Sequence, residues 1–194
     1  NGYEPTSKED NKIVYTIKHG DNIKLTAKIK DGYTFKEWTC TEGGIVGSSD
    51  NPYSITMPAK DTVMQVSGKP NAYKLKYNAN GGTGDDVIFD VKYNETVQMI
   101  ENPFTNDSII CKFSGWSLDA DDLIPDYREK RYVPVSEMAS ALELENSPGA
   151  TITLYAIWDE APTIIASDRY FTIDDAINGK ITEDELFNKA TVTD

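Results

Sequence analysis

Phe35-Lys36-Glu37-Trp38 and Phe113-Ser114-Gly115-Trp116 place the same aromatic pair, three residues apart, in the two halves of this 194-residue chain. A segment of alternating apolar and polar residues precedes each pair. A loop and a further apolar strand segment follow it, at residues 63–66 in the first half and 152–158 in the second. Similarity of order as well as of spacing is typical of tandem repeats. We therefore expect two small β-rich modules, each with its own aromatic core.

The first module is predicted to consist of short strands. Ile13, Tyr15 and Ile17 alternate with polar residues, and the same period of two continues over residues 23–29, beyond the turn sequence 20–22. A period of two indicates half-buried strands. After the loop-like run 42–52, which is rich in Gly, Ser and Asn, Ile55 and Met57 and then residues 63–66 complete the module.

The second module is expected to begin after the junction sequence Gly68-Lys69-Pro70-Asn71. Period-two alternation predicts strands near residues 73–77, 87–93, 97–99, 111–116 and 152–158. Val135, Met138 and Leu142 share one side of a helical wheel, which predicts a short helix inside an insertion at residues 119–148. The fold class we expect is mainly β with a short helix, α+β.

The composition is acidic, with 32 Asp plus Glu against 19 Lys plus Arg and a net charge of -13. Nucleic acid phosphates or an anionic membrane would repel such a chain, so neither is an expected partner. The charge either keeps an exposed protein soluble or serves cation binding. Asp119, Asp121 and Asp122 could offer oxygen ligands to calcium, although the glycine and distal glutamate of an EF-hand loop are missing. We favour a solvated acidic loop over a metal site.

Catalytic groups are scarce in the sequence. Nucleophilic catalysis needs a base beside the nucleophile, and His19, expected at a strand end, is the single histidine. Cys40 and Cys111 are expected to be half-buried thiols in different modules, unpaired by a disulfide. The glycine-rich residues 81–84 follow a strand without a P-loop lysine, so a hairpin turn explains them better than phosphate binding. We expect neither an enzyme nor a cofactor.

Aromatic residues are the remaining candidates for binding a ligand or a partner. The tryptophans at positions 38, 116 and 158 could stack on a sugar, but their repeated positions favour a role in the core. Tyr53, Tyr127 and Tyr132 are interpreted as more exposed, and they are our candidates for contact with a partner.

Three motifs of the second module resemble the internalin-type B-repeat (Listeria-Bacteroides repeat) of bacterial surface proteins: residues 77–84 (Tyr-Asn-Ala-Asn-Gly-Gly-Thr-Gly), 113–117 (Phe-Ser-Gly-Trp-Ser) and 153–158 (Thr-Leu-Tyr-Ala-Ile-Trp). The chain departs from that pattern at Ile110-Cys111, where Gly-Tyr is expected, and in the long insertion 118–150. The first module is similar to the divergent relative of this repeat through residues 31–38 and 55–58.

The resemblance implies tandem small β-grasp (ubiquitin-like) modules. We expect a divergent B-repeat-like module at residues 1–70, a B-repeat module at 71–160, and a linker with the start of an immunoglobulin-like domain at 161–194. In that last segment, Thr172 with Asp175 and Thr182 with Glu185 are spaced like capping boxes, which predicts two short helix starts.

The resemblance also implies a non-enzymatic stalk of a surface protein, extracellular and either wall-attached or secreted, that spaces or presents binding domains. The alternative is an adhesin fragment that binds a host or neighbouring-cell protein or glycan through loops of the second module. No apolar stretch of about 20 residues is present, so no membrane insertion is expected. Residues 1–11 lack signal-peptide features, and we interpret the chain as a monomeric interior fragment of a larger protein.

Overall fold

A computed structural model describes residues 3–9, 12–108, 111–160, 163–166 and 190–193. The two helix starts expected near residues 172 and 182 lie outside these ranges. The described chain is mainly β and contains one short helix, as the sequence predicts. The chain forms two compact units. The first comprises residues 1–75, 88–97 and 132–152, and the second comprises residues 76–87, 98–131 and 153–194.

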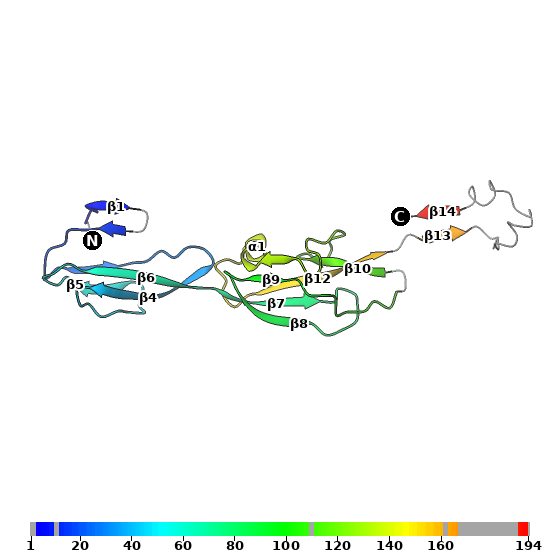
Figure 1. The fold of residues 1–194 in the computed structure, drawn as a ribbon, viewed down its shortest axis with the longest axis horizontal. Coiled ribbons are helices and arrows are strands. Elements are labelled where there is room, and N and C mark those ends of the chain that lie inside the picture. Colours follow the sequence, from blue (N-terminus) through cyan, green and yellow to red (C-terminus); the bar gives the residue numbers. More distant parts are fainter. Residues whose placement is uncertain (1–2, 10–11, 109–110, 161–162, 167–189, 194) are drawn as a thin grey trace, which may run out of the picture. The chain divides into compact units, whose positions relative to one another are not determined.

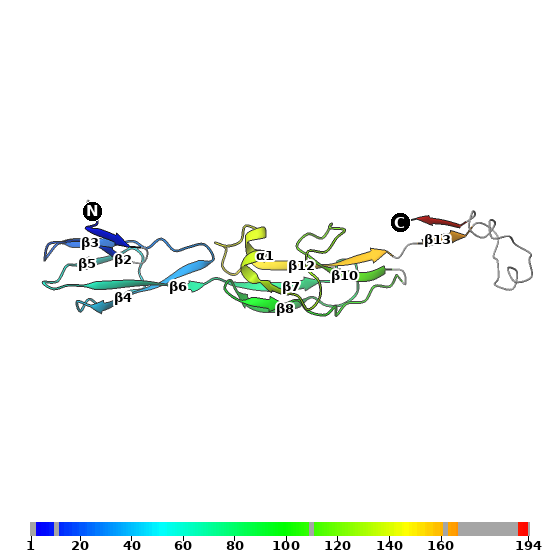
Figure 2. The same ribbon diagram turned by 45° about the horizontal axis from the view of Figure 1, so that its top comes forward.

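Two antiparallel strand pairs form the early part of the first unit. Strand β3 (Asn22–Leu25) pairs with β5 (Tyr53–Thr56), and the long β4 (Tyr33–Glu42) pairs with β6 (Val63–Pro70). Figure 1 shows β4 and β6 running side by side, and Figure 2 shows β3 beside β5. The buried apolar side chains of these strands are Ile23, Trp38 and Ile55.

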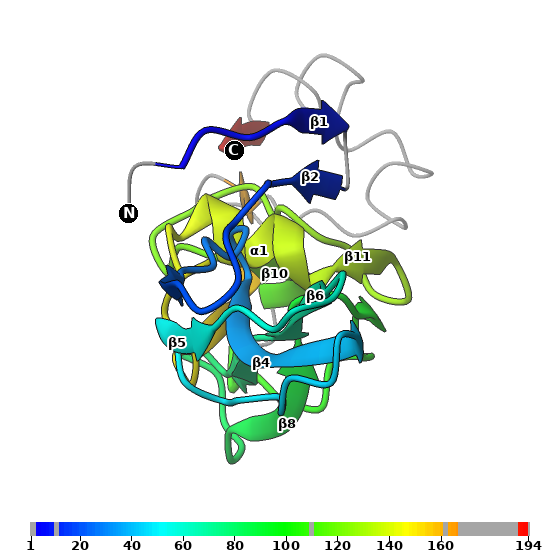
Figure 3. The same cartoon turned by 90° about the vertical axis from the view of Figure 1, so that its left-hand side faces the viewer.

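The start of the chain differs from the prediction. The strand expected over residues 13–17 is limited to β2 (Lys12–Val14), which pairs with an unpredicted β1 (Ser7–Glu9) in a two-stranded hairpin (Figure 3). One face of this strand was expected to be buried, but Ile13 in β2 and Tyr15 just after it leave 50% and 46% of their surface exposed. The period of two therefore predicted the strand but not its burial, because a hairpin buries side chains only where another layer covers it.

The second expected strand is also shorter than its pattern. It was expected over residues 23–29, yet β3 ends at Leu25. Beyond it, the backbone of Ala27 pairs with a side chain, because its N–H donates to Asn51 Oδ1 at 2.8 Å and its carbonyl accepts from Asn51 Nδ2 at 2.9 Å. The amide satisfies the groups that a strand partner would otherwise bind.

The rest of the first unit is built around helix α1 (Val135–Ala141), which is one residue shorter than predicted. Val135, Met138 and Ala139 are buried on its inner side. The short β11 (Tyr132–Pro134), which was not predicted, leads into the helix and pairs with β9 (Thr96–Gln98). Further buried apolar residues of this unit are Tyr73, Leu75, Val91, Val133 and Ile152.

The remaining strands are β7 (Ala72–Asn78), β8 (Val87–Lys92), β10 (Cys111–Ser117) and β12 (Thr151–Glu160), which occur in the sheet order β10-β12-β7-β8. In the second unit Trp116 is fully buried, among an aromatic cluster that includes Tyr77 and Phe104. Strand β13 (Thr163–Ala166) pairs antiparallel with β14 (Ala190–Thr193) in the last described segment.

Candidate functional site

A β-bulge separates the Phe and Trp of each repeated pair. In β4 the register shifts between Phe35 and Glu37, and in β10 it shifts between Phe113 and Gly115. Residues three apart in a regular strand face opposite sides, but one extra residue in a bulge returns the later residue to the same side. The ring centroids consequently lie 6.0 Å apart in Phe35–Trp38 and 4.8 Å apart in Phe113–Trp116.

Each tryptophan also pairs through its backbone with a residue of the following loop. The N–H of Trp38 donates to the Ser48 carbonyl at 2.7 Å, and the Ser48 N–H donates back at 3.0 Å. Trp116 and Tyr127 exchange the same two bonds at 2.8 and 2.9 Å. The phenylalanine, bulge, tryptophan and loop bridge therefore form one local unit that occurs twice in the chain, and in both places the tryptophan is buried.

The insertion after Trp116 begins with a short acidic loop. The buried hydroxyl of Ser117 lies between two carboxylates and contacts Asp122 Oδ2 and, at 2.9 Å, Asp126 Oδ2, which also accepts from the N–H of Leu118 at 3.0 Å. Asp119 Oδ1 accepts from the N–H of Asp121 at 3.0 Å. These carboxylates thus shape the loop.

The three aspartates suggested as metal ligands are not brought together by this loop. Asp119 and Asp122 bond to different donors, and Asp121 contributes its backbone N–H to the turn. Across the part of the chain that the structure describes, no group of three or more His, Cys, Asp or Glu is arranged to hold a metal ion.

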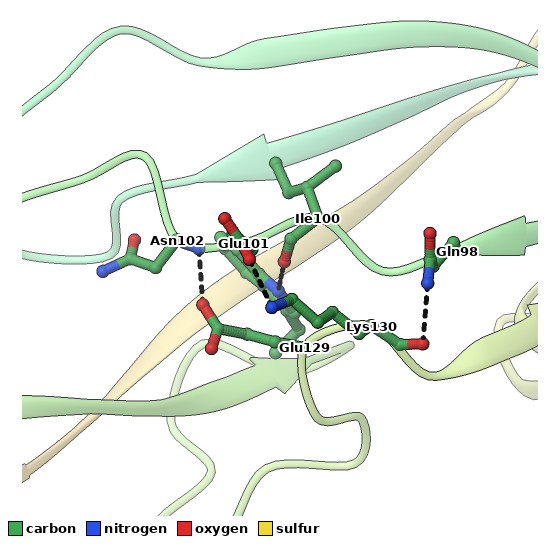
Figure 4. Close-up of polar contacts among 7 residues, drawn as sticks. Gln98, Ile100, Glu101, Asn102, Glu129 and Lys130 are labelled. Carbon is green, nitrogen blue, oxygen red and sulfur yellow. Dashed lines mark hydrogen bonds and ion pairs between the residues drawn. The ribbon is translucent and has the colours of Figure 1, made fainter.

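Residues 129 and 130, within the insertion, are held to residues 98–102 by polar contacts (Figure 4). Lys130 Nζ lies 2.5 Å from Glu101 Oε1, and Glu129 Oε1 accepts from the Asn102 N–H at 2.6 Å. The Lys130 ammonium lowers the pKa of the Glu101 carboxyl by hydrogen bonding to it, and Glu101 in turn raises the pKa of Lys130. Gln98 Nε2 adds a bond of 3.1 Å to the carbonyl of Lys130.

The tip of this fastened insertion is apolar and exposed. Leu123 and Ile124 expose 87% and 80% of their surface, more than any other large apolar side chains in the described ranges. Pro125, which follows them, packs towards Gly115, where a Cβ atom would lie 2.6 Å from the Pro125 Cβ. Leu123 and Ile124 are therefore the clearest candidate for a contact surface, because two large apolar side chains lie exposed side by side. Their exposure was not predicted from the sequence.

The tyrosines expected to be exposed behave differently from one another. Tyr132 is 67% exposed, as expected. Tyr53 is partly exposed, and its hydroxyl donates to the Val46 carbonyl at 2.7 Å. Tyr127 is a correction, because it is only 5% exposed. It pairs with the core residue Trp116 through its backbone, and the Arg131 guanidinium lies 5.8 Å from its ring centroid.

The residues weighed for catalysis are one histidine and two cysteines. His19 lies exposed in the turn before Gly20. Cys40 and Cys111 are both free and partly buried, and the Cys40 thiol donates to the Glu42 carbonyl at 2.8 Å. No helix among the described residues is long and apolar enough to span a membrane.

Comparison with protein families agrees with the repeated local unit. Residues 12–71 match the divergent InlB B-repeat domain, and residues 73–139 match the Listeria-Bacteroides repeat domain. The chain carries two B-repeats in tandem. Repeats of these families are typical of bacterial surface proteins and are generally non-enzymatic. No curated protein and no solved structure matches the chain.

The matches follow the order predicted from the motifs. The second match ends at residue 139, whereas the motif Thr153–Trp158 lies beyond it. That motif still joins the second B-repeat, because β12 pairs with β10 and the ring of Trp158 lies 5.8 Å from that of Phe113.

Proposed function

We propose that this tandem of B-repeats is a non-enzymatic stalk segment that spaces or presents binding domains of a bacterial surface protein. The observation that carries the proposal is the unit of phenylalanine, bulge and buried tryptophan, which occurs once in each repeat. In both repeats the tryptophan of this unit, which could otherwise stack on a sugar, is buried: Trp38 is 8% exposed and Trp116 is fully buried. A repeat whose tryptophan lies in its own core is suited to a stalk, in which successive repeats add to the length of the protein.

The finer architecture belongs to the same proposal. We take residues 1–70 and 71–160 as the two modules and 161–194 as a linker with the start of an immunoglobulin-like domain. The sheet β10-β12-β7-β8 and helix α1 supply the elements that a β-grasp module needs. We also propose that the segment lies outside the cell, wall-attached or secreted, and that it is monomeric.

A replacement experiment tests spacing directly. The chain is inserted between a wall anchor and a reporter binding domain displayed on bacteria, and capture of reporter ligand on beads is measured. Deletion of residues 12–160 should reduce capture, and two unrelated immunoglobulin-like modules in their place should restore it. Failure of the unrelated modules to restore capture would show that the B-repeats do more than add length.

The exposed loop tip favours a second candidate function. Leu123 and Ile124 could enter an apolar pocket on a host or neighbouring-cell protein, with the adjacent aspartates facing a basic rim. A glycan array and a pull-down with the purified chain address this adhesin hypothesis. The double variant Leu123→Ser with Ile124→Ser should abolish any retained ligand, whereas Val46→Ser, an equally exposed site in the first repeat, should not. If the chain retains no ligand above background, the adhesin hypothesis is wrong and only the spacer function remains.

A further inference from the structure

Asn71 lies at the junction of the two B-repeats, between the last residue of β6 and the first residue of β7. Asparagine is usually a surface residue, yet this one is only 3% exposed. A buried amide must find partners for its two side-chain groups as well as for its backbone. The position of those partners shows what Asn71 holds together.

The four polar groups of Asn71 are divided equally between the two repeats. Towards the first repeat, its N–H donates to the Gly32 carbonyl at 2.9 Å, and its Oδ1 accepts from Thr34 Oγ1 at 2.5 Å. Towards the second module, its carbonyl accepts from the Tyr93 N–H at 2.9 Å, and its Nδ2 donates to the Glu145 carbonyl at 2.6 Å.

Three further contacts surround this amide. The rings of Tyr33 and Tyr93 meet edge to face with centroids 5.9 Å apart. Asn146 Nδ2 donates to Asp31 Oδ1 at 3.0 Å. Gly32 has a φ of 79°, and a Cβ there would overlap the ring of Tyr93. All of these residues belong to one compact unit.

We propose that Asn71 couples the two B-repeats thermodynamically, so that they unfold as one cooperative unit. If either repeat unfolded alone, two of the four polar groups of Asn71 would lose their partners. Unpaired polar groups are costly in a buried environment. Nearest-neighbour coupling of this kind decides whether a repeat array behaves as one body or as separate beads. The proposal does not depend on whether the chain acts as a spacer or as an adhesin.

The chemistry requires an asparagine at this position. The isosteric change Asn71→Asp retains the acceptor for Thr34 but replaces the donor to Glu145 with an oxygen, which faces a carbonyl oxygen. Serine would be too short to reach both partners. Asn71→Asp therefore breaks the side-chain bond to the second repeat and weakens the coupling without changing side-chain size. Thr34→Val, which removes the single bond to Asn71 Oδ1, provides a milder variant.

Urea unfolding followed by NMR on the full chain tests the coupling, with amide signals of β4 reporting on the first repeat and those of β10 on the second. The two midpoints should coincide in the wild-type chain. In Asn71→Asp they should separate by about 1 M urea, and in Thr34→Val they should separate by less. If Asn71→Asp does not fold, Thr34→Val alone decides the question.

A matched control uses Asn102, whose side chain bonds only within the second repeat, to the N–H and carbonyl of Phe104. Asn102→Ala should lower both midpoints together in the wild-type background and only that of the second repeat in the Asn71→Asp background. Separate midpoints in the wild-type chain, or coincident midpoints in both junction variants, would overturn the proposal.

Discussion

Trp38 and Trp116 occupy equivalent positions but use their indole groups differently. Trp116 Nε1 donates to the Ile100 carbonyl at 3.1 Å, whereas Trp38 Nε1 is buried without a hydrogen-bond partner. Both tryptophans were predicted to lie in the core, and both are buried. The sequence could not distinguish them, because the acceptor for Trp116 comes from a residue 16 positions away.

This difference predicts unequal costs of substitution. Trp116→Phe removes both ring area and a hydrogen bond, whereas Trp38→Phe removes ring area and an unsatisfied donor. We expect Trp116→Phe to lower the free energy of unfolding by roughly 1 kcal/mol more than Trp38→Phe. Urea titration of both variants measures the difference, and equal losses would show that the indole bond contributes nothing.

Tyr77 predicts a loss of stability at high pH. Burial raises the pKa of its phenol to about 12 in the folded chain, against 10.0 for a free tyrosine. The contribution of buried, neutral Tyr77 to the free energy of unfolding is therefore complete below pH 10. It is lost as the pH rises from 10 towards 12, because the tyrosine phenol ionises at lower pH in the unfolded chain than in the folded one. Urea midpoints between pH 9 and 12 should fall less steeply in Tyr77→Phe. Some dependence should remain, since burial also raises the pKa of Tyr73.

At the scale of elements, the bulges explain a spacing that strand periodicity does not allow. A three-residue separation places two side chains on opposite faces of a regular strand. The sequence showed the equal spacing in both repeats, and only the pairing of β4 with β6 and of β10 with β12 shows how one face holds both rings.

The bulge in β10 depends on a close approach at Gly115. A Cβ atom there would lie 2.6 Å from the carbonyl oxygen of Tyr127 and 2.6 Å from the Cβ of Pro125. Gly115→Ala should therefore push away the loop that bridges to Trp116 and destabilise the chain by about 2 kcal/mol or more. Thermal unfolding measures the loss. Gly68→Ala in β6, whose nearest atom would be 3.4 Å away, is the control and should change stability by less than about 0.5 kcal/mol.

For the molecule as a whole, the negative net charge lowers the stability of the folded state. With 32 acidic and 19 basic residues, repulsion disfavours the compact state, and salt screens that repulsion. The urea midpoint should rise when NaCl increases from about 10 mM to about 300 mM. Sodium sulfate cannot serve as the comparison, because it also strengthens apolar burial. A midpoint that falls with NaCl would mean that ion pairs such as Lys130–Glu101 outweigh the net repulsion.

The amino-acid sequence by itself determined the mainly β class, the helix at residues 135–142 to within one residue, the burial of Trp38 and Trp116 and the order of the two B-repeats. Trp158, which was also predicted to lie in the core, is only partly buried. These features follow from local periodicity and from motifs of a few residues. Only the tertiary structure decided that Tyr127 is buried, that Leu123 and Ile124 are exposed, and that Asn71 joins partners as distant as Gly32 and Glu145. Burial and hydrogen bonding depend on which segments, distant in the sequence, come into contact. Periodicity along the chain does not predict those contacts.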